Sequence, residues 1–268
     1  MNISESSFST HLPYSPRVNI STIEMKKDQK LFVVRDDVLP GGTKQRAIIP
    51  YLQGLQKKGF NHFIYLSHFC GFAQISFAHG CKVLGLKSTI FTTKDLNNKL
   101  HSNTLIAQKY GAEIKVCASL DQAEYEAQEY FETNLRNHLI PTGFNDELFI
   151  NLLAERLHEQ WDFIQSKFLI NEIWLPFGTG AMVSAFKKVV PEFIQIHVVD
   201  LNILDSYDPE VVKIKNDSRV VYHQSELAFH EVSKNPPPIS ANDFYDAKVW
   251  EHIELKSNQN AIWWNVAK

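Results

Sequence analysis

The sequence predicts a two-lobed α/β protein with a cleft between the lobes. Its 268 residues suffice for one large α/β domain or two smaller ones, with ample material for a buried core. Between residues 62 and 137, strand-like and helix-like segments alternate, which is typical of a parallel sheet with right-handed crossovers. Glycine turns follow strand-like segments at residues 41–42 and 178–180. We therefore expect two parallel-type sheets, each flanked by helices.

The composition excludes several classes of protein. Hydrophobic residues make up 44% of the chain, charged residues 21%, and the formal net charge is −3, as in an ordinary globular protein. No basic run exceeds a pair such as Lys57-Lys58, so we expect no extended nucleic-acid surface. No apolar run approaches the roughly 18 residues of a membrane helix, and the N-terminus lacks the pattern of a signal peptide. We therefore expect no association with a membrane.

The cysteines and histidines predict neither disulfides nor bound metal. Cys70, Cys81 and Cys117 are an odd number of cysteines without CxxC spacing, which favours a reducing, cytoplasmic location. The eleven histidines show no ligand spacing such as HExxH. A metal site is therefore not expected.

The first part of the chain is predicted to begin the larger lobe. We expect residues 1–20 to form an N-terminal arm and residues 31–34 to form a strand that leads to the glycine turn. Apolar residues then recur at helical spacing up to Gly59, and Pro50 predicts that this helix kinks or restarts. Residues 21–58 are expected to join residues 141–268 in this large, cofactor-binding lobe.

Residues 59–140 are predicted to form the smaller lobe. Strands are expected at residues 62–66, 88–92 and 112–116, and helices at residues 72–83, 95–109 and 120–137. In the remainder of the large lobe, helices are expected at residues 146–165, 181–190 and 246–255, and strands at residues 172–177, 194–199 and 261–264.

Lys44 is a candidate catalytic amine because it follows the turn Gly41-Gly42-Thr43 and opens a helix. The positive end of the helix dipole disfavours a cation there, so a neutral amine or an imine is favoured. The alternative interpretation is an ordinary solvated lysine.

The segment Gly178-Thr179-Gly180, between a strand and a helix, is a candidate phosphate site because it offers consecutive backbone N–H groups and a hydroxyl to an anion. It is not a P-loop, and the dinucleotide pattern GxGxxG fails at Val183. Asp200 ends the next strand, where a ribose-binding acid would lie, so a Rossmann-type nucleotide or S-adenosylmethionine enzyme is an alternative. A tight turn without a ligand is the second alternative.

Two further stretches carry candidate site residues. In Ser67-His68-Phe69-Cys70-Gly71, the glycine permits close approach of a flat ligand, and Cys70 is either a nucleophile or a small buried thiol. Tyr245 and Asp246 begin the last helix, where capping alone accounts for the carboxylate. The pair could also supply an acid/base and a partner for a protonated ring nitrogen.

These segments together resemble the fold type II (tryptophan-synthase-β-like) pyridoxal-phosphate enzymes, in particular the aminocyclopropane-carboxylate deaminase and D-cysteine desulfhydrase branch. Arg35-Asp36-Asp37 followed by Gly41-Gly42-Thr43-Lys44-Gln45-Arg46 is similar to the branch's acidic-then-GGNKxRK segment. Pro141-Thr142-Gly143 resembles its PxGG segment, and Phe244-Tyr245-Asp246-Ala247-Lys248 its VYxGK segment. The resemblance runs from about residue 31 to the C-terminus.

The resemblance implies roles for residues at matching positions. Lys44 would hold pyridoxal phosphate as a Schiff base, and Tyr245 would be a second acid/base. The implied cofactor contacts are Lys44, Gly71, Phe72, Gly178, Thr179, Gly180, Asp246 and Asn265. The implied substrate contacts are Ser67, His68, Cys70 and Phe144.

The sequence departs from the family pattern where cofactor ring and substrate are bound. Phe72 replaces the asparagine that contacts the ring, and Cys70-Gly71-Phe72-Ala73 replaces the serine-asparagine-glutamine run that receives the substrate carboxylate. Phe144 replaces the second glycine of PxGG, and Ala181 a common glycine of the phosphate loop. These changes put the family substrate in doubt more than the cofactor.

The resemblance implies a homodimeric enzyme that acts at the α-carbon of an amino acid or similar small molecule. Deamination or β-elimination is the default reaction. Decarboxylation, or another reaction on an amino acid carried on a nucleoside or modified base, is an alternative. A protein that binds the cofactor or a partner without turnover is another, because of Phe72.

Overall fold

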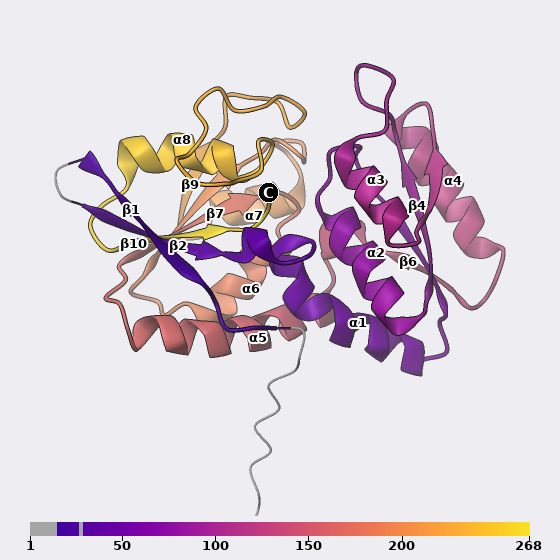
Figure 1. The fold of residues 1–268 in the computed structure, drawn as a ribbon, viewed down its shortest axis with the longest axis horizontal. Coiled ribbons are helices and arrows are strands. Elements are labelled where there is room, and N and C mark those ends of the chain that lie inside the picture. Colours follow the sequence, from indigo (N-terminus) through magenta and orange to yellow (C-terminus); the bar gives the residue numbers. More distant parts are fainter. Residues whose placement is uncertain (1–14, 27–28) are drawn as a thin grey trace, which may run out of the picture.

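The computed structural model describes residues 15–26 and 29–268 and contains two lobes (Figure 1). Most of the predicted arm, residues 1–14, lies outside the described residues. Each lobe is a sheet covered by helices, so the predicted two-lobed α/β class is confirmed.

The large lobe contains a six-stranded sheet in the order β1-β2-β10-β7-β8-β9. All neighbouring pairs are parallel except β1 with β2. In Figure 1, α8 covers one face of this sheet and α5 and α6 cover the other. The strands are β1 Ile20–Glu24, β2 Lys30–Arg35, β7 Glu172–Phe177, β8 Gln195–Asp200, β9 Val220–Gln224 and β10 Ala261–Asn265. The helices are α1 Gln45–Lys57, α5 Glu147–Gln165, α6 Ala181–Val189, α7 Pro209–Lys215 and α8 Asp246–Lys256.

The small lobe contains a four-stranded parallel sheet in the order β5-β4-β3-β6. Its strands are β3 His62–Leu66, β4 Lys87–Thr92, β5 Glu113–Val116 and β6 Asn137–Ile140. Its helices are α2 Ala73–Leu84, α3 Ser102–Lys109 and α4 Leu120–Glu132.

Single-turn 3-10 helices cover Asp36–Val38, Gly42–Lys44 and Thr142–Phe144.

Several predicted elements differ from the structure. The helix expected at residues 95–109 begins only at Ser102, because the Asp95 carboxylate accepts the amides of Asn97 and Lys99 and closes a turn. The helix expected at residues 120–137 ends at Glu132, and residues 137–140 form the edge strand β6. The antiparallel strand β1, the helix α7 and the strand β9 were not predicted.

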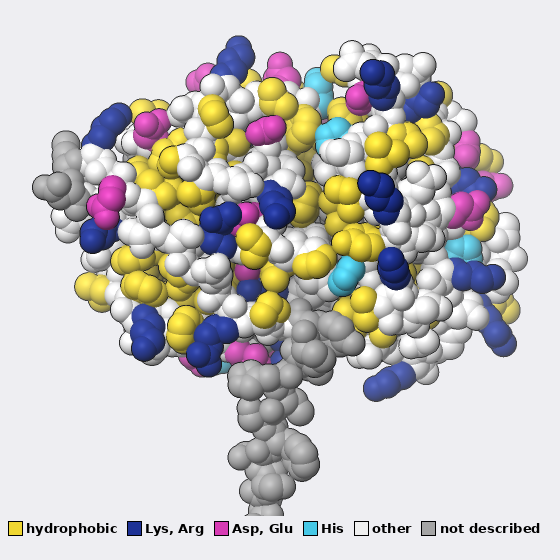
Figure 2. Space-filling model, in the orientation of Figure 1, with side chains coloured by type: hydrophobic (Ala, Val, Ile, Leu, Met, Phe, Trp, Pro, Cys, Tyr) yellow, Lys and Arg dark blue, Asp and Glu magenta, His cyan; other side chains and the backbone are white. Residues whose placement is uncertain are grey.

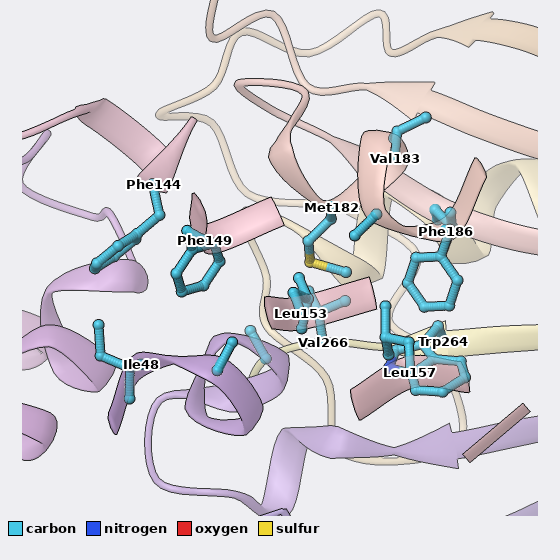
Figure 3. Close-up of a cluster of buried hydrophobic side chains, with 14 of the residues drawn as sticks. Ile48, Phe144, Phe149, Leu153, Leu157, Met182, Val183, Phe186, Trp264 and Val266 are labelled. Carbon is cyan, nitrogen blue, oxygen red and sulfur yellow. The ribbon is translucent and has the colours of Figure 1, made fainter. Parts of the chain in front are cut away.

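One buried hydrophobic cluster connects the lobes. It includes Ile48 of α1, Phe144, side chains of α5 and α6, and Trp264 of β10 (Figure 3). The helix α1 packs against both α2 and α5 and remains one helix through Pro50. This continuous packing fixes the ends of strands from both sheets on either side of one cleft.

Candidate active site

The cleft between the lobes lies at the carboxyl ends of β3, β7 and β10, where ligands of parallel α/β sheets commonly bind. Its volume of about 830 Å³, including space open to solvent, suits a small-molecule ligand. Lys44, Gly178 and Tyr245 line it on one side, and His68 and Phe72 on the other.

The glycine turn before Lys44 packs directly against the C-terminal segment. Gly42 has φ +71°, and a Cβ there would lie 1.9 Å from the Val266 carbonyl oxygen. The Thr43 amide donates to the same oxygen at 3.2 Å. Only glycine permits this close approach, which brings Lys44 to the end of β10.

A buried ion pair holds the start of α1. Arg46 donates to both carboxylate oxygens of Asp36, at 2.5 and 2.8 Å, and both side chains are 1% exposed. The indole Nε1–H of Trp264 donates to Asp36 at 2.9 Å and lies 3.2 Å from the Thr43 hydroxyl. The Asp36 carboxylate thus joins Arg46 to β10, and the Trp264 indole also contacts Thr43.

Lys44 faces the cleft as a partly exposed side chain. Burial lowers the pKa of its amine to about 8, from an ordinary value near 10.4. No hydrogen bond or ion pair joins it to another described residue. Its neutral fraction near neutral pH therefore exceeds that of an exposed lysine, as a nucleophilic amine requires.

The predicted phosphate loop forms the wall that follows β7. Gly178, Thr179 and Gly180 line the cleft, and Gly180, with φ +91°, precedes the first residue of α6. The first amides of a helix have no acceptor within it and carry the positive end of its dipole. This arrangement suits a phosphate, because backbone N–H groups would donate to its oxygens.

A second glycine makes the phosphate loop fit the neighbouring segment. Gly143 has φ +65°, and a Cβ there would lie 1.9 Å from the Thr179 hydroxyl oxygen. The Gly143 amide donates to the hydroxyl of Tyr65, at 3.2 Å. Thr179 can therefore reach its place only because residue 143 has no side chain.

On the small-lobe wall, Ser67, His68 and Gly71 line the cleft and Cys70 does not. The Ser67 hydroxyl donates to the carbonyl of His68 at 3.0 Å. Cys70 is fully buried, and burial raises the pKa of its thiol to about 12. It is therefore a protonated, shielded thiol, which disfavours a nucleophilic role.

Phe72 and Tyr245 meet across the cleft. The Phe72 amide donates to the Tyr245 hydroxyl oxygen at 3.3 Å. Burial raises the pKa of the Tyr245 phenol, so the phenol stays protonated at neutral pH. Because its oxygen already accepts the Phe72 amide, its O–H remains available to donate to a group in the cleft.

Asp246, Asn265 and Phe144 do not line the cleft. Asp246 is fully buried and accepts the amides of Val266 at 2.9 Å and Ala267 at 3.0 Å, and burial raises the pKa of its carboxyl group. Both amides belong to residues that line the cleft. As a ring-nitrogen partner, Asp246 would have to exchange these contacts, and that role stays a prediction.

The other two residues are packed behind the cleft wall. Phe144 is buried and stacks on Tyr65 with ring centroids 5.3 Å apart. Asn265 is buried and donates to the carbonyl of Ser240 at 2.8 Å. Their predicted contacts with substrate and cofactor stay predictions.

Sequence reasoning missed other residues of the lining, among them Tyr65, Ile203 and Phe229. Tyr65 could have been found, because it lies at the carboxyl end of a predicted strand. Ile203 and Phe229 lie in irregular segments that carry no motif, and only the tertiary structure brings them to the cleft.

The alternative nucleotide site is not formed around Asp200. Its carboxylate is buried, accepts the Asn202 amide at 2.8 Å and accepts the Tyr222 hydroxyl. It does not line the cleft. A ribose would therefore have to displace both partners.

Solved structures of similar fold support the sequence resemblance. An ACC deaminase homologue has a TM-score of 0.79 at 15% identity, over 95% of this chain and 90% of that chain. A hydrogen sulfide-producing enzyme from Fusobacterium nucleatum has a TM-score of 0.70 at 15% identity, over 95% of this chain and 96% of that chain. Diaminopropionate ammonia lyase of Escherichia coli has a TM-score of 0.64 at 13% identity, over 96% of this chain and 84% of that chain. No protein-family model and no curated protein matches the sequence.

The chain shares the fold of these structures, so the fold predicted from the resemblance to fold type II pyridoxal-phosphate enzymes is confirmed. The residues of the cleft fit that cofactor on the observations above. Lys44 offers an amine with a lowered pKa for an aldehyde, and Thr179 occupies a space that a Cβ on Gly143 would fill. The start of α6 offers amides for a phosphate.

Proposed function

We propose that the protein is a pyridoxal-phosphate-dependent enzyme that acts at the α-carbon of an amino acid or an amino-acid-like small molecule. The observation that carries the proposal is that Lys44 lines the same cleft as the loop from Gly178 to Gly180, and the lowered pKa of its amine supports it. The fold of the three enzymes named above supports it.

Lys44 would hold the cofactor through its aldehyde and then move a proton at the substrate α-carbon. An amine with a pKa near 8 is suited to both tasks, because it is neutral often enough to attack and basic enough to accept a proton. When bound, the cofactor supplies an electron sink for the negative charge that develops at this carbon.

The other walls of the cleft would bind the cofactor and orient the substrate. The loop Gly178–Gly180 and the start of α6 would hold the phosphate, and Phe72 would pack against the ring without a hydrogen bond. The Tyr245 phenol would donate a proton to a leaving group, because burial keeps it protonated. Deamination or β-elimination is the default outcome of these roles.

The described surface adds little about partners. Among the described residues no helix is long and apolar enough to cross a membrane. On the face in Figure 2, basic side chains are scattered among acidic and uncharged ones. We propose a homodimer, as the resemblance implies, and a cytoplasmic location, as the three cysteines favour.

Absorption spectroscopy tests the proposal. Purified protein with pyridoxal phosphate should show the band of a lysine-bound cofactor, and Lys44→Ala should abolish it. Lys57→Ala, at the C-terminal end of α1, is the control and should keep the band. A wild-type protein without a band would contradict the proposal.

A panel of L- and D-amino acids then separates an enzyme from a binding protein. A substrate should shift the band and release a product such as ammonia or a keto acid. A band that no amino acid shifts would favour the alternative without turnover, for which Phe72 in place of the expected asparagine is the motivating observation.

A further inference from the structure

The buried thiol of Cys70 has a role that the proposed function does not use. Its Sγ lies 3.2 Å from Nδ1 of His68, a residue that lines the cleft. Cys70 is 0% exposed, so its thiol is shielded from bulk water. The contact joins a buried thiol to a residue of the cleft lining.

The contact with the thiol favours one tautomer of His68 over the other. Burial raises the pKa of Cys70 to about 12, so the thiol keeps its hydrogen near neutral pH. Within residues 15–26 and 29–268, Nδ1 of His68 is the one acceptor found for that hydrogen. An S–H donor opposite an unprotonated Nδ1 satisfies both groups, whereas the other tautomer sets an N–H against a weakly accepting sulfur and leaves the S–H buried without an acceptor.

The imidazole itself is held neutral and in one orientation. Burial, with the nearby His230 and His101, lowers the pKa of His68 to about 4. The ring also packs edge-to-face against Phe229 at a centroid distance of 5.2 Å. No hydrogen-bond partner of Nε2 is found in the described part of the chain.

We propose that Cys70 is a positioning residue that fixes His68 as a neutral imidazole with Nε2–H available to an oxygen atom bound in the cleft. That oxygen belongs either to the phenolic group of the cofactor or to a carboxylate of the substrate. The donor replaces the polar contact that Phe72 cannot make. The identity of the oxygen rests on the proposed function, but the tautomer does not.

Nitrogen-15 NMR of histidine-labelled protein without added ligand tests the tautomer. His68→Gln identifies the resonances of His68 by their loss. The expected result is a protonated Nε2 and an unprotonated Nδ1 in the wild type and in Cys70→Ser, whose hydroxyl also donates. In Cys70→Ala the preference should weaken to a mixture of tautomers.

Two outcomes of this experiment would overturn the proposal. One is a wild-type His68 protonated at Nδ1. The other is an unchanged tautomer in Cys70→Ala, since the thiol would then not determine it. If Cys70→Ala does not fold, as judged by circular dichroism, Cys70→Val serves as the second variant without a donor.

Ligand binding identifies the oxygen. The affinities of pyridoxal phosphate and of its 3-deoxy analogue, which lacks the phenolic oxygen, are measured in the wild type, His68→Gln and His68→Leu. If the phenolic oxygen is the acceptor, the preference for pyridoxal phosphate falls roughly tenfold in His68→Leu and is kept in His68→Gln.

If a carboxylate is the acceptor, this preference is unchanged, and acetate shifts the Nε2–H resonance while methylammonium does not. If the preference is unchanged and acetate does not shift the resonance, the binding role of His68 is overturned. A fixed tautomer in a protein that does not bind pyridoxal phosphate would instead contradict the proposed function alone.

Discussion

Lys44 and Lys248 are two lysines on which burial has the same effect in different surroundings. Burial lowers the pKa of each amine to about 8. The Lys248 amine donates to the carbonyls of Ala228 at 2.7 Å and Phe229 at 3.2 Å, whereas Lys44 has no such partner in the described structure. A lowered pKa therefore does not by itself mark a reactive amine. An open cleft and the lack of a competing partner distinguish Lys44.

The segments around Lys44 and Lys248 are also held in place by different interactions. The residues beside Lys44 are fixed by the buried pair of Asp36 and Arg46, whose charges balance. Lys248 forms no ion pair with a described carboxylate and instead holds the segment that places Phe229 in the cleft. We infer that Lys44 serves chemistry and Lys248 serves the shape of the cleft.

The largest expected effect is that of Asp36→Ala, which leaves the Arg46 charge buried and unpaired. The expected loss of unfolding free energy is about 3–5 kcal/mol, measured by denaturant unfolding. Lys30→Ala is the milder control, because both members of its pair with Glu24 are exposed. Equal losses in the two variants would show that the buried pair has no special role beside Lys44.

Gly143→Ala should combine backbone strain with displacement of Thr179. A residue with a side chain at φ +65° costs roughly 1–3 kcal/mol, and here the new Cβ would also meet the Thr179 hydroxyl. Gly85→Ala is the matched control, because Gly85 has the same φ of +65° and no atom within 4 Å of its added Cβ. Affinity for pyridoxal phosphate should fall only in Gly143→Ala. Loss in both would remove the argument for a close fit at the phosphate loop.

Lys248→Met should weaken the fold and keep the cofactor band. A buried and a part-buried carbonyl lose their donor, which costs roughly 1–3 kcal/mol, while removal of a buried amine offsets part of this loss. Denaturant unfolding and absorption with pyridoxal phosphate measure the two effects. A variant that folds but shows no band would contradict the division of roles between the two lysines.

A further expected effect is on the pH dependence of stability. The folded pKa of each lysine, about 8, lies below the unfolded value near 10.4, so between these pH values the folded state binds fewer protons. Each lysine therefore contributes an unfolding free energy that rises with pH over this window. Lys44→Met and Lys248→Met should each remove part of that rise.

The unfolding free energy of each variant must be compared with that of the wild type at the same pH. Groups such as Cys70 have a raised folded pKa and contribute in the opposite direction. Variants whose stability follows the same pH curve as the wild type would show that burial does not lower the pKa of these amines.

Local sequence predicted those parts of the fold that depend on periodicity. Alternating strand and helix patterns gave the parallel sheet of the small lobe, and the glycine turns gave the positions of Lys44 and the loop Gly178–Gly180. The edge strand β6 was missed because Asn137–Ile140 is a short segment directly after a polar helix. Its pairing with β3 is a contact of the tertiary structure.

The site was predicted only where one segment supplies both the turn and the functional group. Asp246 lies at its predicted helix start, but its carboxylate binds the amides of Val266 and Ala267 and not the cleft. Phe229 reaches the cleft through a carbonyl contact of Lys248, which no local pattern encodes. The pairing of Cys70 with His68 depends on the loop conformation in the same way.

The most direct test is reduction of the protein with borohydride in the presence of pyridoxal phosphate, followed by mass spectrometry of its peptides. Both lysines have the lowered pKa that favours reaction with an aldehyde, so the experiment makes them compete. We predict that the reduced cofactor is found on Lys44 and not on Lys248. Labelling of Lys248 in preference to Lys44, or no labelling of either, would contradict the assignment of the active site.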